Sequence, residues 1–336
     1  MERDGIIEQS PSPWDSAVTV FAKSDGTPPF CVDYRSTIND NMVNTSWPMP
    51  HLESHLDTVG GARYITVCDV QNAYNQIPVA ASEQENTAFV THNGKWVLER
   101  LPFGIYNAPF LFSRIMSLAL AHFEPKCGLL VYMNDCVCCS STWENNLQLL
   151  ENMFKALQAV GLTLKPSNVQ CGPREVKYLG HVQTADGIRI VEDRIKAIVN
   201  LSTRITIKEL RSALTMVNFV RKFLTDLAGI LAPLVALTKK EVVKKVHKRW
   251  GPAYDQAYAN VKQLPTQAPM LRFPDFHRDF VIHVDVSEAG AGAFFAQHKG
   301  EDLVIIEYFS HRFDDSQRHY SARLKQFYAG VLAIQH

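Results

Sequence analysis

The sequence predicts a fold of the α+β class, with enough chain for about two domains. Residues 144–161 repeat apolar side chains at the spacing of a helix, whereas residues 64–70 and 280–297 contain short apolar runs typical of strands. The chain has 336 residues, of which 46% are hydrophobic and 20% are charged, as in folded globular proteins. The pattern changes at residues 270–276, where we expect a domain boundary.

Strands and turns are predicted for the first part of the chain. Its short apolar runs are separated by Pro, Gly and Asn, and one of them, "YITVCDV" at 64–70, carries Asp69 near its end. Further on, "LLVYMNDCVCCS" at 129–140 predicts a β-hairpin with the pair Asn134-Asp135 as its two-residue turn. Taken singly, each aspartate is more often a turn or cap residue than a ligand.

Two helices are predicted from their first residues. Residues 107–123 have helical apolar spacing, with Asn107 as the N-cap and a proline in the first turn. Residues 206–223 begin with Thr206 and Glu209 at the spacing of a capping box. Both segments are therefore expected to start where these polar residues stand.

The helix predicted at 144–161 has the clearest pattern. Gly161 stands where the residue that ends a helix is expected. Four apolar residues form the stripe that we expect to be buried: Leu147, Leu150, Phe154 and Leu157.

Composition restricts the location of the protein more than its partners. Lys plus Arg and Asp plus Glu both number 34, so the net charge indicates no polyanion, although a local basic channel is compatible with it. The start, "MERDGIIEQ", is too charged for a signal peptide. The longest apolar stretch, 223–238, is interrupted by Asp226 and Pro233. We therefore expect an intracellular protein, cytoplasmic or nuclear, that is neither secreted nor inserted in a membrane.

Cysteines and one basic run allow two further interpretations. The seven cysteines lack paired spacing, which indicates free thiols in a reducing compartment. The run "CVCC" at 136–139 predicts small core residues rather than zinc ligands. The basic run at 239–250 either contacts nucleic-acid phosphates or forms a solvated helix face, and the sequence leaves both open.

Asp69 and Asp135 together suggest metal chemistry. Two carboxylates on strands from distant parts of a chain suit a divalent cation, because Mg²⁺ prefers oxygen ligands. A pair of such ions can activate a 3′-hydroxyl and a leaving pyrophosphate. Spacing alone makes this a weak signal.

A series of motifs along the whole chain strengthens the signal for a metal site at Asp69 and Asp135. The motifs are "GIIEQSPSPWDSAV", "DGTPPFCVDYR", "WPMPHLESHLDTVGGARY", "DVQNAYNQI", "LPFGIYNAPFLFSRIM", "VYMND", "VKYLGHVQTADGI", "TIKELRSAL", "FVIHVDVSEAGAGA" and "HYSARLKQFYAGVLAI". In these motifs and their order, the chain resembles the reverse transcriptase and ribonuclease H region of gypsy-class LTR retrotransposon Pol polyproteins.

The resemblance implies a right-hand polymerase architecture of fingers, palm and thumb. It implies truncated fingers and palm at 1–180, thumb and connection regions at 181–270, and the first part of a ribonuclease-H-like α/β domain at 271–336. We expect both ends to be incomplete, since few residues precede "GIIE" and the chain stops at His336.

Site residues are implied position by position. Asp69 and Asp135 match metal-binding aspartates of the palm, and Asp285 matches the first metal-binding aspartate of the ribonuclease H. Tyr74 matches the aromatic residue that excludes a 2′-hydroxyl from the nucleotide site. From the residues alone, Tyr74 would be a core tyrosine beside a strand. A loop beneath the nucleotide and template is implied for Leu101, Pro102, Phe103 and Gly104.

Positions that depart from the family pattern are as informative as the positions that match it. Asn134 stands where the family has a carboxylate that bridges both metals, and a neutral amide should bind metal far less well. In the nucleotide clamp, Ser24 and Pro29 replace a lysine and an arginine, with Lys23 displaced by one position.

Two further positions depart from the pattern. The segment Lys165-Pro166-Ser167-Asn168 lacks a basic residue expected near the leaving group. Gln326 replaces a metal-binding glutamate of the ribonuclease H.

The implied function is RNA-directed DNA polymerisation by two-metal nucleotidyl transfer. It would use Mg²⁺ (or Mn²⁺), a primed RNA or DNA template and deoxynucleoside triphosphates, and a homodimer is compatible with it. The departures predict that this copy is catalytically impaired. The alternative is a non-catalytic nucleic-acid-binding remnant of a decaying or host-recruited retroelement.

Overall fold

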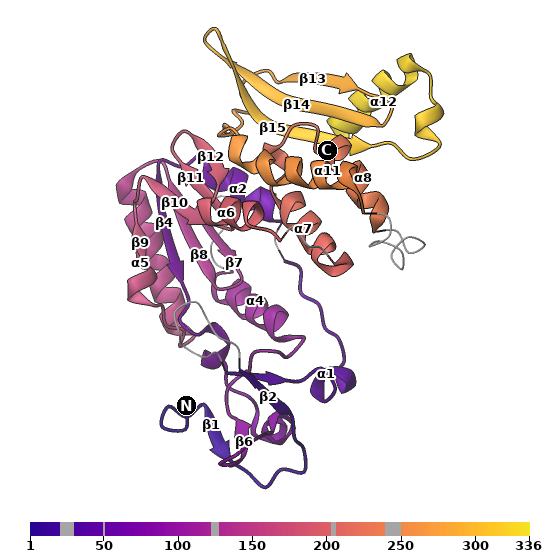
Figure 1. Cartoon of the computed structure of the whole chain (residues 1–336). Coiled ribbons are helices and arrows are strands. Elements are labelled where there is room, and N and C mark those ends of the chain that lie inside the picture. Colours follow the sequence, from indigo (N-terminus) through magenta and orange to yellow (C-terminus); the bar gives the residue numbers. More distant parts are fainter. Residues whose placement is uncertain (21–29, 50, 122–127, 203–205, 239–249) are drawn as a thin grey trace. The chain divides into compact units, whose positions relative to one another are not determined.

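The chain divides into two compact units, Met1–Pro173 and Arg174–His336. The computed structural model describes residues 1–20, 30–49, 51–121, 128–202, 206–238 and 250–336 (Figure 1). Among these described residues, no helix has the length and apolar character needed to cross a membrane.

The first unit mixes short strands with helices. Its elements are β1 (Ile7–Gln9), β2 (Ala17–Val20), β3 (Phe30–Asp33), α1 (Ile38–Asn41), α2 (Leu52–Gly60), β4 (Tyr64–Asp69), η1 (Ala73–Gln76), α3 (Ala81–Gln84), η2 (Glu85–Thr87), β5 (Phe89–Thr91), β6 (Gly94–Leu98), α4 (Ala108–Ala119), β7 (Leu129–Tyr132), β8 (Asp135–Ser140), α5 (Trp143–Ala159), η4 (Pro166–Asn168) and β9 (Gln170–Cys171).

Two small antiparallel sheets share one core near the start of this unit. One sheet has the strand order β1-β6-β5, and the other is the hairpin β2-β3. Val32, Tyr34, Phe89 and Leu98 are buried between them. The Tyr34 hydroxyl donates a hydrogen bond to the Thr87 carbonyl at 2.9 Å, so the buried phenol is satisfied.

The central sheet has the order β7-β8-β4-β9, and α4 and α5 lie against one of its faces (Figure 1). Cys68, Cys136 and Cys138 face these helices and are fully buried. The cysteine run is therefore a set of small core residues, as predicted. Small side chains let the two helices approach the sheet closely.

The hairpin of β7 and β8 differs by one residue from the prediction. Tyr132 pairs with Asp135, so the loop residues are Met133 and Asn134, and Asp135 is the first residue of β8. Met133 has a φ of +53°, in the left-handed region that costs a non-glycine residue about 1 kcal/mol or more. The sequence prediction missed this because a methionine gives no signal for a left-handed backbone.

Helix α5 runs from Trp143 to Ala159, close to the predicted 144–161, and Gly161 ends it as predicted. Thr142 accepts a hydrogen bond from the Asn145 N–H at its start. At its end Gly161 has a φ of +74°, and the Leu162 N–H donates to the Leu157 carbonyl at 2.9 Å. These contacts form a Schellman motif, which explains why the helix stops at Ala159.

The buried face of α5 is not the predicted stripe. Leu147 and Phe154 are 44% and 41% exposed, so two of the four stripe residues face outward. The buried residues are Asn146, Leu150, Met153 and Leu157. A pattern that counts only apolar residues cannot place a buried asparagine on the core face.

Asn146 bonds to both central strands. Its amide nitrogen donates to the carbonyls of Tyr64 at 3.1 Å and Cys138 at 3.0 Å, on β4 and β8. Its amide oxygen accepts from the Thr66 hydroxyl at 2.5 Å. Because Asn146 and Thr66 are 0% exposed, these bonds have no competition from water.

Helix α4 confirms the predicted segment in part. It begins after Asn107 with a proline in the first turn and ends at Ala119. However, the Asn107 side chain does not cap the helix. It donates to the Val43 carbonyl at 2.9 Å and accepts from the Thr45 N–H at 3.2 Å, so it ties the helix start to another segment.

The second unit contains two antiparallel sheets and a group of helices. Its elements are β10 (Glu175–Tyr178), β11 (His181–Thr184), β12 (Gly187–Ile190), α6 (Glu192–Val199), α7 (Ile207–Phe219), η5 (Arg221–Phe223), α8 (Leu227–Leu237), α11 (Pro252–Gln263), η6 (Leu264–Gln267), β13 (Val281–Val286), β14 (Gly290–Lys299), β15 (Asp302–Arg312), η7 (Gln317–His319) and α12 (Ala322–Gln335).

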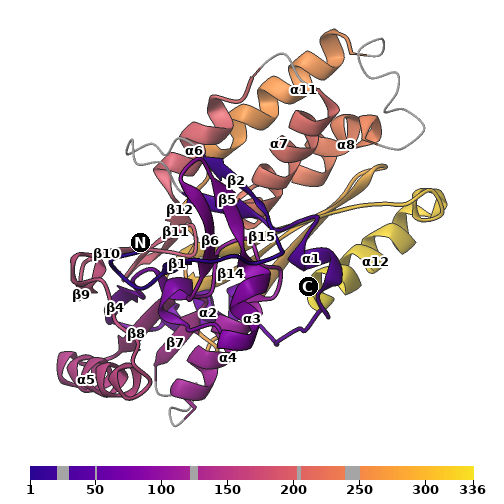
Figure 2. The same ribbon diagram turned by 90° about the horizontal axis from the view of Figure 1, so that it is seen from below.

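Helices α6, α7, α8 and α11 group together, and α12 packs on β13 and β14 (Figure 2). The capping box of α7 is present as predicted, with Thr206 and Glu209 bonded to each other's backbone N–H groups. The strands predicted at 280–297 are β13 and β14, paired antiparallel.

The chain around the predicted boundary at 270–276 is bonded on both sides. Leu271 exchanges two backbone hydrogen bonds with Ile188 of β12, at 2.8 and 2.9 Å. The next residue, Arg272, donates its N–H to the Ile305 carbonyl of β15 at 2.8 Å. These bonds hold the second unit together across that segment.

A buried histidine stands at the start of β11. His181 is 1% exposed and stacks between Phe219 and Phe223, with ring centroids 5.4 and 5.6 Å away. Its Nδ1 lies 2.9 Å from the Leu179 carbonyl, so it carries the hydrogen in the neutral ring. Burial, followed by the charge of Lys222, lowers the pKa of His181 to about 4.

We expect Asn146→Ala to destabilise the first unit by about 2–4 kcal/mol, since it removes the three buried hydrogen bonds of the Asn146 amide. Urea unfolding followed by circular dichroism measures the change. The exposed neighbour Asn145→Ala is the matched control, with a change below about 0.5 kcal/mol. Equal effects of both substitutions would contradict the role given to Asn146.

We expect the second unit to lose stability as the pH falls from about 6.5 to about 4. In this window His181 takes up a proton in the unfolded chain but stays neutral when folded, so low pH favours unfolding by roughly 2–3 kcal/mol. Unfolding curves at several pH values test this. His181→Phe keeps an aromatic ring and should flatten the pH dependence, whereas His277→Phe at an exposed position should not.

Candidate active site

The two palm aspartates lie opposite each other on adjacent strands. In the pairing of β4 with β8, Asp69 is the direct partner of Asp135, and both side chains are half-buried. Burial, followed by the charge of Asp69, raises the pKa of Asp135. Two residues that are 66 positions apart in sequence are thus brought together, as the sequence predicts.

Asn134 is tied to the same strand end by two hydrogen bonds. Its amide nitrogen donates to Oδ1 of Asp69 at 2.6 Å. Its backbone carbonyl accepts from the Val70 N–H at 3.0 Å. The residue in the expected position of a bridging carboxylate is therefore a hydrogen-bond donor to Asp69.

A second amide reaches Asp69 from η4. The Asn168 amide nitrogen donates to Oδ2 of Asp69 at 3.0 Å, and the Lys165 N–H donates to the Asp69 carbonyl at 3.1 Å. Sequence reasoning noted Asn168 only as a missing basic residue. The departure of the segment 165–168 from the family pattern was the one signal that pointed to it.

The donors present do not fit a pair of divalent ions. Mg²⁺ takes oxygen ligands, yet both Asn134 and Asn168 direct N–H groups at the oxygens of Asp69. The register of β4 and β8 brings two carboxylates together here, those of Asp69 and Asp135. Consistently, no group of three or more His, Cys, Asp and Glu side chains in the described part of the chain is arranged to hold a metal.

Two predicted nucleotide-binding residues touch each other. Tyr74, in η1, has its ring 4.9 Å from that of Phe103 and 5.8 Å from that of Phe112, both in edge-to-face geometry. Partial burial raises the pKa of the Tyr74 phenol. Tyr74 thus packs on the core beside the sheet and also contacts Phe103, which is 46% exposed.

Gly104 requires a glycine. Its φ is +96°, and a Cβ at this position would lie 2.9 Å from the Val32 carbonyl oxygen. The loop is held by Asn39, which donates to the Gly104 carbonyl and accepts from the Tyr106 N–H, each at 2.9 Å. The predicted residues Lys23, Ser24 and Pro29 lie outside the described residues.

A cavity of about 530 Å³ lies next to Phe103. Among the described residues, it is lined by Met1, Asp4, Ile6, Cys31, Val32, Asn72, Asn75, Leu98, Pro102 and Phe103. Neither lysine nor arginine occurs in this part of the lining. In the described residues, the cavity therefore lacks the cations that triphosphates need.

The predicted ribonuclease H residues lie on different elements and are not hydrogen-bonded to each other in the described structure. Asp285, on β13, is exposed and accepts a hydrogen bond from the Val286 N–H at 2.9 Å. Its neighbours Val284 and Val286 pack against α12, so Asp285 projects from the opposite face. Gln326 is exposed on α12.

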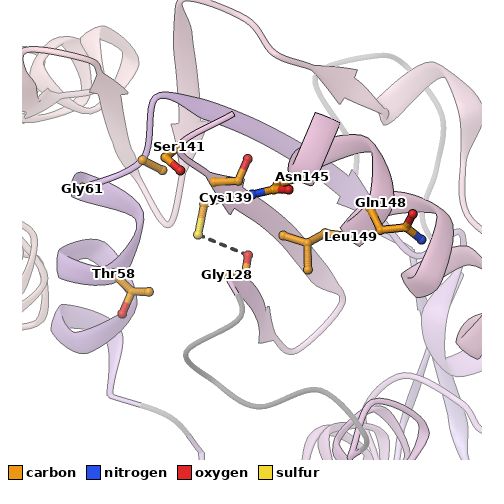
Figure 3. A pocket seen from close by; sticks show the side chains of 10 residues that line it. Thr58, Gly61, Gly128, Cys139, Ser141, Asn145, Gln148 and Leu149 are labelled. Carbon is orange, nitrogen blue, oxygen red and sulfur yellow. Dashed lines mark hydrogen bonds between the residues drawn. The ribbon is translucent and has the colours of Figure 1, made fainter. Parts of the chain in front are cut away.

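Another cavity of about 530 Å³ lies at the far end of β8 from Asp135, between α2 and α5 (Figure 3). The Cys139 thiol, which lines it, donates to the Gly128 carbonyl at 3.2 Å. Burial raises the pKa of this thiol to about 11, so it is not a reactive nucleophile. The cavity adds no residue to the candidate site.

Two family descriptions match the chain. Residues 28–183 match "Reverse transcriptase (RNA-dependent DNA polymerase)", and residues 250–336 match "RNase H-like domain found in reverse transcriptase". The first segment contains Asp69 and Asp135, and the second contains Asp285.

Relatives from two organisms match along nearly the whole chain. The retrovirus-related Pol polyprotein from transposon 297 of Drosophila melanogaster is 30% identical over 100% of this chain and 31% of its own length. The Pol polyprotein from transposon gypsy of the same species is 27% identical over 99% of this chain and 33% of its own length. The Tf2-3 transposon polyprotein of Schizosaccharomyces pombe is 26% identical over 99% of this chain and 25% of its own length. The chain thus spans between a quarter and a third of these relatives.

Solved structures match the fold. A foamy viral protease-reverse transcriptase in complex with double-stranded DNA has a TM-score of 0.85 and 23% identity over 99% of this chain and 57% of its own. The same type of protein in complex with an RNA/DNA hybrid has a TM-score of 0.78 and 22% identity over 99% of this chain and 44% of its own. These likenesses confirm the predicted α+β fold of a right-hand polymerase. Together, the matches identify the chain as a member of the reverse transcriptase family, with a reverse transcriptase domain at 28–183 and an RNase H-like domain at 250–336.

Proposed function

We propose that this chain binds a primed nucleic-acid template as a retrotransposon polymerase does, and that its nucleotidyl transfer is strongly reduced. The family assignment supports the polymerase origin. The foamy viral structures are complexes of those proteins with double-stranded DNA or with an RNA/DNA hybrid. The substrates proposed for this chain are a primed RNA or DNA template and deoxynucleoside triphosphates.

Each region has a proposed part in this function. Residues 1–180 correspond to fingers and palm, 181–270 to thumb and connection, and 271–336 to part of a ribonuclease H. In the palm, Asp69 and Asp135 are the remaining metal ligands. In the ribonuclease H, Asp285 is the remaining one.

The nucleotide site is proposed to lie at the cavity beside Phe103. There Tyr74 would lie under the sugar and Phe103 would support the base pair, with Gly104 allowing the loop to pass close to Val32. The missing cations of the nucleotide clamp, at Ser24 and Pro29, lower the expected affinity for a triphosphate.

One observation carries the reduced activity, namely the hydrogen bond from the Asn134 amide to Asp69. Reverse transcriptases use divalent metal ions, and the resemblance to the family implies a carboxylate where Asn134 stands. Here the side chain adds an N–H donor instead of an anionic ligand. We therefore propose that Mg²⁺ or Mn²⁺ binds weakly at Asp69 and Asp135, which also makes a purely nucleic-acid-binding role the second candidate function.

We expect the chain to bind a primer–template duplex with a strong dependence on salt, because phosphate contacts dominate such binding. We expect primer extension on an RNA template to fall about two to three orders of magnitude below a family member that has the carboxylate, the usual cost of losing one preorganised electrostatic contact. Fluorescence anisotropy measures the binding, and gel analysis with Mg²⁺ or Mn²⁺ measures extension. Asn134→Asp alone should recover little, since Ser24 and Pro29 remain.

Asp69→Ala should remove any residual extension and leave duplex binding unchanged. Glu144→Ala, an exposed carboxylate on α5, is the matched control and should change neither. Efficient extension that disappears in Asp69→Ala would contradict the reduced activity. Failure to bind the duplex at low salt would contradict the nucleic-acid-binding function itself.

A further inference from the structure

Both carboxylate oxygens of Asp69 are held by side-chain amides. Asn134 donates to Oδ1 at 2.6 Å and Asn168 donates to Oδ2 at 3.0 Å. We call this pair of amides on Asp69 the amide clamp. It joins the end of β4, the tip of the β7–β8 hairpin and η4, which are far apart in sequence.

Each amide is held in place by its own backbone. The Asn134 carbonyl accepts from the Val70 N–H at 3.0 Å. The Asn168 N–H donates to the Lys165 carbonyl at 2.9 Å within η4, and the following strand β9 pairs with β4 through Gln170 and Val67. The donors are therefore preorganised around the carboxylate rather than brought in by flexible chains.

The clamp and a divalent cation need the same carboxylate. An ionised carboxylate only accepts, and amide N–H groups that bond to it make hydrogen bonds about twice as strong as neutral ones. These N–H groups place positive hydrogens where a cation would approach. A metal ion at Asp69 therefore meets a carboxylate whose two oxygens each already accept one of these bonds, which weakens its binding.

We propose that Asn134 and Asn168 form an autoinhibitory amide clamp, which keeps Asp69 in a hydrogen-bonded state that weakens the binding of divalent cations. This inference rests on the proposed function, because it concerns the same site. It adds Asn168 as a positioning residue that acts through Asp69. It also predicts that a carboxylate at position 134 is not sufficient, since Asn168 still occupies Oδ2.

Binding of Mn²⁺, followed by electron paramagnetic resonance of the free ion, tests the clamp without any reaction. We expect Asn134→Asp with Asn168→Ala to bind Mn²⁺ at least tenfold more tightly than Asn134→Asp alone, which corresponds to about 1.4 kcal/mol. Asn134→Asp combined with Asn152→Ala, a half-buried asparagine on α5, is the matched control and should bind like Asn134→Asp. Equal Mn²⁺ affinities, with and without Asn168, would overturn the proposal.

Thermal unfolding in the presence of a chelator gives a second readout. Asn168→Ala should lower the Tm by about 2–4 °C in the natural chain but not in an Asp69→Ala background, where its acceptor is gone. The same loss in both backgrounds would also overturn the clamp. If Asn168→Ala does not fold, Asn168→Ser gives the same comparisons.

Duplex binding separates this inference from the proposed function. If every variant binds the primer–template duplex but Asn168 does not affect Mn²⁺ affinity, the clamp is wrong and the proposed function stands. If none of the variants binds the duplex, the proposed function is wrong, whatever the Mn²⁺ result.

Discussion

The pairing of β4 with β8, held from one side by the Asn146 amide, is the interaction on which the candidate site depends. A slip of one residue in an antiparallel pair would turn every side chain to the other face. In the observed register Asp69 meets Asp135, while Cys68 and Cys136 meet in the core. Asn146 bonds to the carbonyls of Tyr64 and Cys138, one on each strand, so its position on α5 fits only this register.

The same register creates an electrostatic difficulty at the strand ends. Asp69 and Asp135 lie side by side and half-buried, and the raised pKa of Asp135 reflects that environment. In an active polymerase, cations would offset the two charges. Here the amides of Asn134 and Asn168 offset part of the charge on Asp69 through hydrogen bonds. The two amides thus take over part of the role that a cation would have in offsetting the charge of Asp69.

Local signals predicted much of the fold. The strand that carries Asp69, the capping box at Thr206 and the glycine that ends α5 depend on neighbours in sequence, and the structure has all three. The likeness to known motifs predicted that Asp69 and Asp135 serve one site, and their pairing brings them together. Their roles as ligands stay predictions.

The missed features depend on contacts between distant residues. Asn146 is buried because it bonds to two strands, whereas periodicity favoured Leu147 for the core face. Asn168 reaches Asp69 across 99 positions, which no local pattern encodes. The hairpin turn lies one residue before the predicted position, because Tyr132 pairs with Asp135. Met133 is then a turn residue and has a left-handed backbone.

The hydrogen bond from Asn134 to Asp69 also bears on the history of such a chain. A third carboxylate beside Asp69 and Asp135 would repel both in the absence of cations, so an asparagine there lowers the free energy of the metal-free fold. The proposed loss of catalytic capacity and the gain of stability would then come from one substitution, as often occurs at sites built for function. Once selection for polymerisation is relaxed, folding itself favours the asparagine, and the change becomes hard to reverse.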